Sequence, residues 1–119
     1  MAPLETAVNE LRQILATDST APEWRWNVRR RLSEVKDALS GPQARQADAW
    51  LAARASSSNR VRHQLHARAT TLASGVLDKL DAESILQETR RLLTDLEHYV
   101  QRLHDLVYDS VSLELGGSE

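Results

Sequence analysis

The four histidines of this 119-residue chain are its best candidates for catalytic or metal-binding residues. Projected on a helical wheel, His63 and His98 fall almost opposite the apolar face, so we expect both to be solvated. His66 and His104 fall at the edge of that face, and His104 with Asp109 has the spacing H-x4-D. His66, His104 and Asp109 are therefore the candidate metal ligands. Metal sites in helix bundles need several inward-facing ligands from facing helices. We therefore favour edge or surface positions without a metal for these histidines, and we predict no cofactor.

The other reactive residue types form no recognisable catalytic motif. Cysteine is absent, which excludes disulfides, thiolate metal sites and a cysteine nucleophile. A glycine-rich phosphate loop, a nucleophile elbow and a zinc-helix motif are also absent. The serines of Ser56–Ser58 have no indicated base, so helix capping is their favoured role. We predict no catalytic residues and no enzymatic activity.

Nucleic-acid binding is the weakest of the functional hypotheses. The run Arg29–Arg31 lies near Trp24 and Trp26, but a helix spreads three consecutive residues over about 200°. The net charge of −2 does not indicate a polyanionic partner. We predict that Trp24 and Trp50 belong to the core, whereas Trp26 lies off the main apolar face and is a candidate protein contact.

The element that must position these residues is a long C-terminal stretch, Ser84 to Ser110. Apolar pairs recur in it every seven residues, with one further position between successive pairs, and neither Gly nor Pro interrupts it before Leu115. This spacing predicts a helix roughly 40 Å long with one broad apolar face. The positions are Ile85-Leu86, Thr89, Leu92-Leu93, Leu96, Tyr99-Val100, Leu103, Leu106-Val107 and Ser110. Leu96 and Leu103 are at its centre, and we expect them to be fully buried.

Two further helices are predicted before residue 42. The first runs from Pro3 to Ala16 and the second from about Ala21 to Leu39. Thr20 and Glu23 have the spacing of a capping box at the start of the second helix. The sequence Ser40-Gly41-Pro42 is typical of a helix end followed by a new start.

The stretch Gln43–Leu80 reads as one helix or as two, and we favour a break or kink near Ser56–Ser58. Asp81 is the predicted N-cap of the last helix, and Gly116-Gly117 is its predicted end. The tight junction at Asp81 makes the two long segments antiparallel. The sequence therefore predicts an all-α, antiparallel up-down four-helix bundle as a single domain over residues 1–119.

Charge is distributed unevenly along the chain. Residues 21–80 hold eleven Lys and Arg against five Asp and Glu, whereas residues 81–119 hold three against nine. Complementary edges between neighbouring helices are a sufficient reason for this pattern. No apolar run is long enough to span a bilayer, and residues 1–10 lack the pattern of a signal peptide. We expect a cytoplasmic protein with no membrane partner.

The segment from Leu92 to Arg102, the run Asp105-Leu106-Val107-Tyr108-Asp109 and the ending Glu114-Leu115-Gly116-Gly117 together resemble the end of small hemerythrin-like proteins of actinobacteria. That resemblance implies a four-helix bundle, which in this family holds two irons and binds oxygen. The chain departs from the family pattern because it has no histidine before His63, and only His104 and Asp109 match a ligand motif by spacing. The leading hypothesis is a hemerythrin-like bundle without the di-iron site that acts through protein contacts. The alternative is a metal- or oxygen-binding bundle with an unusual ligand set.

The unequal lengths of the predicted helices bear on assembly. The first helix is about half as long as the last, so one end of the long apolar face lacks a covering helix within the chain. Exposed apolar patches of this kind usually mark interaction surfaces. We expect self-association, most simply as a two-fold homodimer, or binding of a protein partner. The candidate contact residues are Trp26, Leu113 and Leu115.

Overall fold

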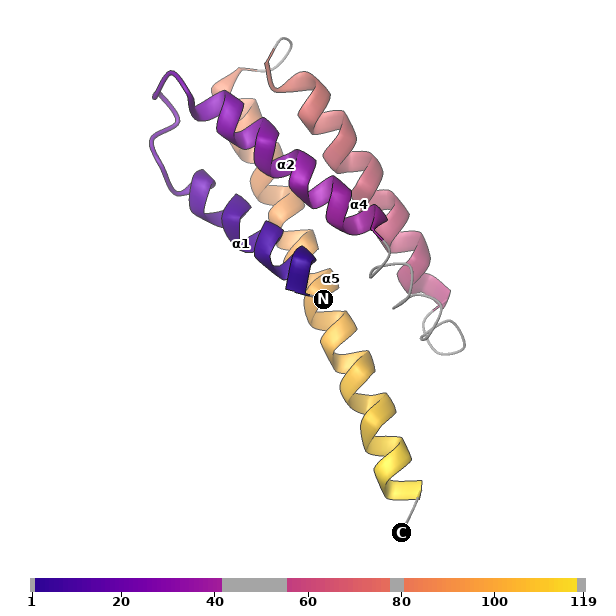
Figure 1. Ribbon diagram of the computed structural model, residues 1–119. Coiled ribbons are helices and arrows are strands. Elements are labelled where there is room, and N and C mark those ends of the chain that lie inside the picture. Colours follow the sequence, from indigo (N-terminus) through magenta and orange to yellow (C-terminus); the bar gives the residue numbers. More distant parts are fainter. Residues whose placement is uncertain (1, 42–55, 78–80, 118–119) are drawn as a thin grey trace.

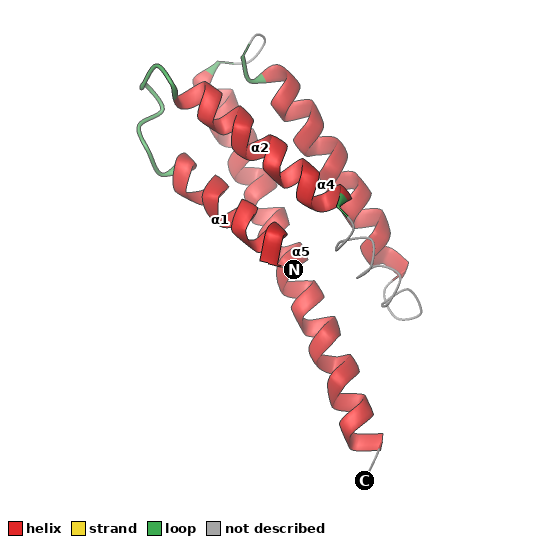
Figure 2. Cartoon of the chain, in the orientation of Figure 1, coloured by secondary structure: helices red, strands yellow, loops and turns green. Residues whose placement is uncertain are grey.

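The fold is seen in a computed structural model of the chain, which describes residues 2–41, 56–77 and 81–117 (Figure 1). The described residues form helices and connecting turns and contain no strand (Figure 2). The helices are α1 (Ala2–Leu15), α2 (Trp24–Ser40), α4 (Ser56–Gly75) and α5 (Ala82–Gly117). The predicted all-α class is therefore confirmed.

The four helices form an antiparallel bundle in which the chain reverses direction between successive helices (Figure 1). The helix α1 packs against α2 and α5, and α4 packs against the same two helices. Each helix is thus flanked by its neighbours in chain order, and the ring closes where α5 meets α1. This arrangement confirms the predicted up-down bundle.

The core is made from one face of each helix. The α5 residues at the centre of the predicted stripe are all buried, with Leu96 at 0% and Leu103 at 2% exposure, so this prediction is confirmed. Trp24 is also buried, as predicted, and its indole nitrogen donates to the carbonyl oxygen of Ile14 at 3.3 Å. The buried apolar residues of the other helices and the turn after α4 are Leu4, Ala7, Val8, Leu11, Leu15, Val28, Leu32, Val35, Leu39, Leu65, Ala69 and Val76.

The predicted start of the second helix is wrong. The helix α2 begins at Trp24, and the preceding Glu23 makes no side-chain capping hydrogen bond. The Thr20 hydroxyl does not cap a helix, because it donates to Asp18 Oδ1 at 2.7 Å, and the Thr20 backbone N–H donates to the same oxygen at 2.9 Å. These two hydrogen bonds, the side-chain one first, hold the pKa of Asp18 below its ordinary value. The sequence Asp18-Ser19-Thr20 therefore forms a local side-chain turn instead of a helix start.

The other predicted helix boundaries agree with the structure. The helix α2 ends at Ser40, and Gly41 is extended, with φ −72° and ψ 167°, as expected for a residue that precedes proline. Asp81 caps α5, because its Oδ1 accepts from the Ser84 backbone N–H at 2.7 Å. That backbone hydrogen bond is the main reason that the pKa of Asp81 is lowered. The helix α5 ends at Gly117, as predicted.

The break or kink predicted near Ser56–Ser58 lies at the edge of a described range, so the structure does not test it. The described helix α4 begins at Ser56, the first serine of the predicted break, whereas residues 42–55, including Trp50, are not described. No described helix has the combination of length and apolar composition that crossing a membrane requires.

The bundle is elongated because α5 is much longer than its neighbours. The helix has 36 residues, or about 54 Å at 1.5 Å per residue, whereas the 14 residues of α1 span about 21 Å. The principal extents of the molecule are 59 × 22 × 20 Å. Among the described helices, α5 extends beyond both the N-terminus of α1 and the start of α4 (Figure 1). The predicted difference in helix length is confirmed.

Candidate functional site

Two arginines bind the ends of α2 and α4 to each other. The Arg25 Nη1 in the first turn of α2 donates to the carbonyl oxygen of Val76, just after α4, at 2.8 Å. The Arg62 Nη1 in α4 donates to the carbonyl oxygen of Leu39, in the last turn of α2, also at 2.8 Å. Carbonyl groups at a helix C-terminus have no partner within the helix and attract cations. Each of the two helices therefore supplies an arginine that donates to a carbonyl oxygen at the C-terminal end of the other.

Ion pairs join the other helix pairs in the described part of the chain. They link basic side chains of α2 and α4 to acidic side chains of α1 and α5, as the charge distribution predicts, and one more joins α1 to α5. The distances are 3.0 Å for Arg31–Glu10, 2.6 Å for Arg68–Asp95 and 2.6 Å for Arg12–Glu97. His104 of α5 also contacts Glu5 of α1, at 2.5 Å. Arg31 also binds Glu34 at 3.0 Å. Burial is the largest single influence on Glu34 and raises its pKa. The hydrogen bonds with Arg31 and Glu10 and the charges of Arg31 and Arg30 together outweigh burial, so the pKa of Glu34 lies below its ordinary value.

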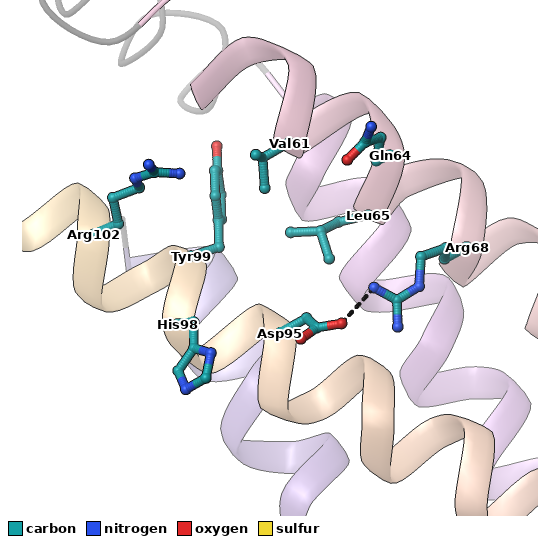
Figure 3. Close-up of a pocket in the computed structure, with 8 residues that line it drawn as sticks. All are labelled: Val61, Gln64, Leu65, Arg68, Asp95, His98, Tyr99 and Arg102. Carbon is teal, nitrogen blue, oxygen red and sulfur yellow. Dashed lines mark hydrogen bonds and ion pairs between the residues drawn. The ribbon is translucent and has the colours of Figure 1, made fainter. Parts of the chain in front are cut away.

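A groove of about 350 Å³ lies between α4 and α5 (Figure 3). Two of its polar groups pair with each other, because Arg68 reaches across from α4 to Asp95 at 2.6 Å. The ring of Tyr99 stands beside Val61, whereas His98 points away from α4 (Figure 3). The lining residues are Val61, Gln64, Leu65, Arg68, Asp95, His98, Tyr99 and Arg102. This groove presents no nucleophile with an adjacent base.

A second groove, of about 310 Å³, lies between α1 and α5. His104 lines it and shares a short contact with Glu5, from Nε2 to Oε1, at 2.5 Å. The pair Arg12–Glu97 lies in the same groove. The groove is therefore bridged by one ion pair, Arg12–Glu97, and by the contact between His104 and Glu5.

The candidate metal ligands do not come together in the described part of the structure. His104 lies on the α1 side of α5 with Glu5, whereas His66 is half-buried on α4 and lines neither groove. The backbone of Asp109 belongs to α5, but its side chain lies outside the described residues. His63 and His98 are exposed, as predicted. Across the described residues, no three side chains of His, Cys, Asp or Glu are close enough to hold a metal ion.

The interior of the bundle, where hemerythrin-like proteins hold their irons, is apolar here. Apart from the hydroxyl of Tyr99, the buried polar side chains in the described ranges are Arg62 and Thr89. Arg62 is committed to the carbonyl oxygen of Leu39, and Thr89 is a single hydroxyl. These residues do not fit a di-iron centre, which needs several inward-facing carboxylates and histidines.

Trp26 lies off the core, as predicted. Its side chain is 61% exposed, and the guanidinium of Arg29 lies 5.5 Å from its ring centroid. Trp26 is in the first turn of α2, which lies near the start of α5 and at the opposite end of the bundle from the end of α5 (Figure 1). The two contacts proposed from the sequence therefore belong to different ends of the molecule.

The remaining candidate is the end of α5 that follows His104, residues 105–117, which we call the projecting segment. Within the bundle, α5 buries the positions of its seven-residue repeat as far as Leu103. The same repeat continues through Leu106, Ser110 and Leu113. The side chains of Leu113 and Leu115 lie outside the described residues, although their backbone is helical. Tyr108 is described and is 73% exposed.

The acidic character of the projecting segment was not among the sequence predictions. It contains Asp105, Asp109 and Glu114 and no Lys or Arg, since the last cationic residue of the chain is Arg102. The signal was present in the sequence as the acidic balance of residues 81–119. The structure adds the location of these acidic residues, because it shows that this end of α5 extends beyond α1 (Figure 1).

Comparison with protein-family models, curated proteins and solved structures finds no match for the chain. The function is therefore inferred from the geometry of the bundle, the composition of its interior and the projecting segment of α5.

Proposed function

We propose that the protein is a non-enzymatic helical-bundle module that acts through protein–protein contacts, and that the projecting segment of α5 is its contact surface. The observation that carries this proposal is the length of α5, which extends beyond α1 by several turns (Figure 1). Residues 105–117 account for about 20 Å of that helix.

The sequence of the projecting segment supports this role. The repeat that is buried at Leu96, Tyr99 and Leu103 continues at Leu106 and Leu113 in the same helical register. A helix with an apolar stripe needs a covering surface, because little of the stability of such a helix comes from helix propensity alone. An apolar helix face that no other described helix covers usually marks an interaction site. A second copy of the chain or a different protein would provide that cover.

The architecture supports the further proposal that the module is hemerythrin-like in fold and lacks the di-iron site. In its favour are the antiparallel four-helix arrangement and an interior of apolar side chains. The commitment of His104 to Glu5 and the exposure of His63 and His98 argue against a histidine-rich interior. Cytoplasmic location stays a prediction from the sequence.

A site-specific photo-cross-linking residue tests the proposal. It replaces Leu113 in one variant and Asp37, an exposed residue of α2, in the control. In cells that produce the protein, we expect cross-links to another polypeptide from position 113 and none from position 37. Equal yields from the two positions, or no adduct from position 113, would contradict the proposal.

Elemental analysis separates the proposal from the metal-binding alternative. We expect no stoichiometric iron in protein purified from iron-supplemented cells, because the buried residues of the described bundle do not fit such a site. About two irons per chain with the absorption of an oxo-bridge would support the alternative instead. His66, His104 and Asp109 would then be the first residues to replace.

A further inference from the structure

We infer that the start of α2 presents a second contact surface, at which Trp26, Arg29 and Arg30 bind an acidic segment of another protein that carries an apolar side chain. We call these three residues the Trp26 face. The inference goes beyond the proposed function, because it concerns the opposite end of the bundle from the projecting segment (Figure 1). It joins three observations: the direction in which Trp26 points, the exposure of its ring and the two cations beside it.

Trp26 lies near the centre of the outward side of α2. At about 100° per residue, it is roughly 160° from the middle of the buried side of the helix. The buried side is formed by Trp24, Val28, Leu32, Val35 and Leu39. The helices α1 and α4 are the neighbours that pack against α2. Trp26 therefore belongs to the surface of the bundle and is not part of an incompletely closed core.

The ring of Trp26 leaves a large apolar area in water, since the residue is 61% exposed. An aromatic side chain buries about 150–250 Å² when it is fully covered, so a partner would remove on the order of 100 Å² from water at this one residue. Tryptophan and arginine are the residue types that most often dominate binding at protein interfaces. Trp26 is therefore suited to anchor an apolar side chain of a partner.

Two exposed arginines follow Trp26 within about one helical turn. The guanidinium of Arg29 lies 5.5 Å from the Trp26 ring centroid, a distance at which cation and ring attract each other. The side chain of Arg30 is 71% exposed, and its Nε lies 3.7 Å from Glu34 Oε1. Arg31 holds the same carboxyl group more closely, at 3.0 Å. Arg29 and Arg30 can therefore donate to a carboxylate of a partner.

The positive charge is local to the C-terminal side of Trp26. The acidic residues Glu23 and Asp37 are also exposed, but Glu23 precedes α2 and Asp37 lies about 10 Å along the helix from Arg30. A partner with Asp or Glu beside an apolar residue is complementary to this arrangement. Its apolar side chain would cover the ring of Trp26, and its carboxylates would reach the two arginines.

The same residues disfavour two other occupants. Two copies of the chain paired about a two-fold axis at Trp26 would bring Arg29 and Arg30 of both copies together, and like charges repel. Single-stranded nucleic acid also stacks on aromatic rings, but its backbone follows a continuous basic groove. Here Glu23 and Asp37 lie on either side of the two arginines along the chain. An acidic protein segment avoids both repulsions.

The test uses the full, isotope-labelled chain and three synthetic peptides. The first peptide has one leucine between pairs of glutamates, the second has alanine in place of the leucine, and the third has the leucine between pairs of lysines. An NMR titration follows the backbone signals and the indole N–H signal of Trp26, which a Trp26→Phe variant identifies among the three tryptophans. We expect the first peptide to bind most tightly and to shift the Trp26 signal. Its affinity should fall as salt rises, because the charge pairs are exposed.

Matched variants locate the binding on the Trp26 face. Trp26→Ala should weaken binding of the first peptide about tenfold, and Arg29→Glu with Arg30→Glu should have an effect of about the same size. Arg60→Glu with Arg102→Glu changes the net charge equally on exposed residues of α4 and α5, and we expect unchanged affinity. Unchanged far-UV circular dichroism and unfolding midpoints show that each variant is folded.

Several results would overturn the inference. They are a Trp26 signal that does not move with the first peptide at millimolar concentration, equal affinities for the three peptides, and equal effects of the two double variants. A single-stranded oligonucleotide that binds more tightly than the first peptide would identify nucleic acid as the occupant instead. Self-assembly in light scattering that Trp26→Ala abolishes would identify a second copy. In each of these cases the proposed function stands, because cross-links from position 113 test it separately.

Discussion

Replacing Arg62 by methionine tests whether the buried arginine holds the α2–α4 pair together. Arg62 is 7% exposed, and its Nη1 donates to the carbonyl oxygen of Leu39 at 2.8 Å. The Arg62→Met variant keeps a long apolar stem of similar shape and removes the guanidinium. It therefore isolates the polar contact from the packing of the side chain.

Three effects set the expected change in unfolding free energy. A hydrogen bond that involves a charged group contributes about 1.5–3 kcal/mol. The attraction of a cation to a helix C-terminus is about 0.3–2 kcal/mol, but it acts through the same carbonyl groups and is not added in full. Taking a guanidinium out of water costs several kcal/mol, of which the methionine variant recovers part. We expect a net destabilisation of about 1–2 kcal/mol, against the roughly 5–15 kcal/mol of a typical domain.

Urea unfolding followed by circular dichroism measures this difference. The matched control is Arg60→Met, because Arg60 is an exposed arginine on the same helix. We expect the control to change the unfolding free energy by less than about 0.5 kcal/mol. The dependence of free energy on urea should be the same for all three proteins, since the buried area does not change.

A methionine variant as stable as the parent would refute this reasoning. It would mean that the buried arginine adds nothing to the net stability of the fold. Replacement of buried ion pairs by apolar residues is often neutral in the same way. Arg25→Met offers an independent check at the other end of the helix pair, where Arg25 donates to the carbonyl oxygen of Val76. Because the two contacts lie at opposite ends of α2, their effects should be additive.

Three further predictions concern the core and the start of α5. Leu96→Ala removes a side chain with 0% exposure and should cost about 2–5 kcal/mol, whereas Leu77→Ala, at a position 36% exposed, should cost less than about 1 kcal/mol; similar unfolding midpoints for the two variants would contradict this. Thr89 is buried and its hydroxyl has no hydrogen-bond partner in the described part of the structure, so Thr89→Val should raise the unfolding free energy by about 1 kcal/mol; a less stable variant would show that the hydroxyl is satisfied. Asp81 has a pKa below its ordinary value of 3.8, so its charged form contributes stability above that pH, and the contribution is lost as the pH falls through the lowered pKa. Asp81→Asn keeps a capping oxygen without a titrating group, and urea midpoints between about pH 5 and pH 2 should therefore fall less steeply than those of the parent; parallel curves would exclude Asp81 as a source of acid sensitivity.

Most of the fold was predicted from the periodicity of the apolar residues. The seven-residue repeat of α5 predicted the burial of Leu96 and Leu103, and Asp81 predicted the start of that helix. These signals are local, because an apolar face and an N-cap depend on residues close together in the chain. The same local reasoning was wrong at Thr20, where Asp18 competes for the hydroxyl that was expected to cap α2.

The contacts between helices were much less predictable. Arg62 occupies a buried position on α4, although an arginine in an amphipathic helix ordinarily indicates the solvent side. Its partner is the backbone carbonyl of Leu39, which no side-chain pattern reveals. The pairing of His104 with Glu5 likewise joins residues 99 positions apart. For the candidate surface, the sequence indicated Leu113 and Leu115, but the point at which α5 leaves the bundle depends on where α1 begins.

The closed ring of helices has a consequence for the order of folding during synthesis. The pairs α1–α2 and α2–α4 join elements that are close in the chain and can form early, since short connections close quickly. The ring closes only when α5 meets α1, through contacts such as Arg12 with Glu97, which are 85 positions apart. Until α5 leaves the ribosome, the apolar faces of α1, α2 and α4 lack the helix that completes the core. A growing chain therefore exposes these faces to chaperones and to other nascent chains until its longest helix arrives.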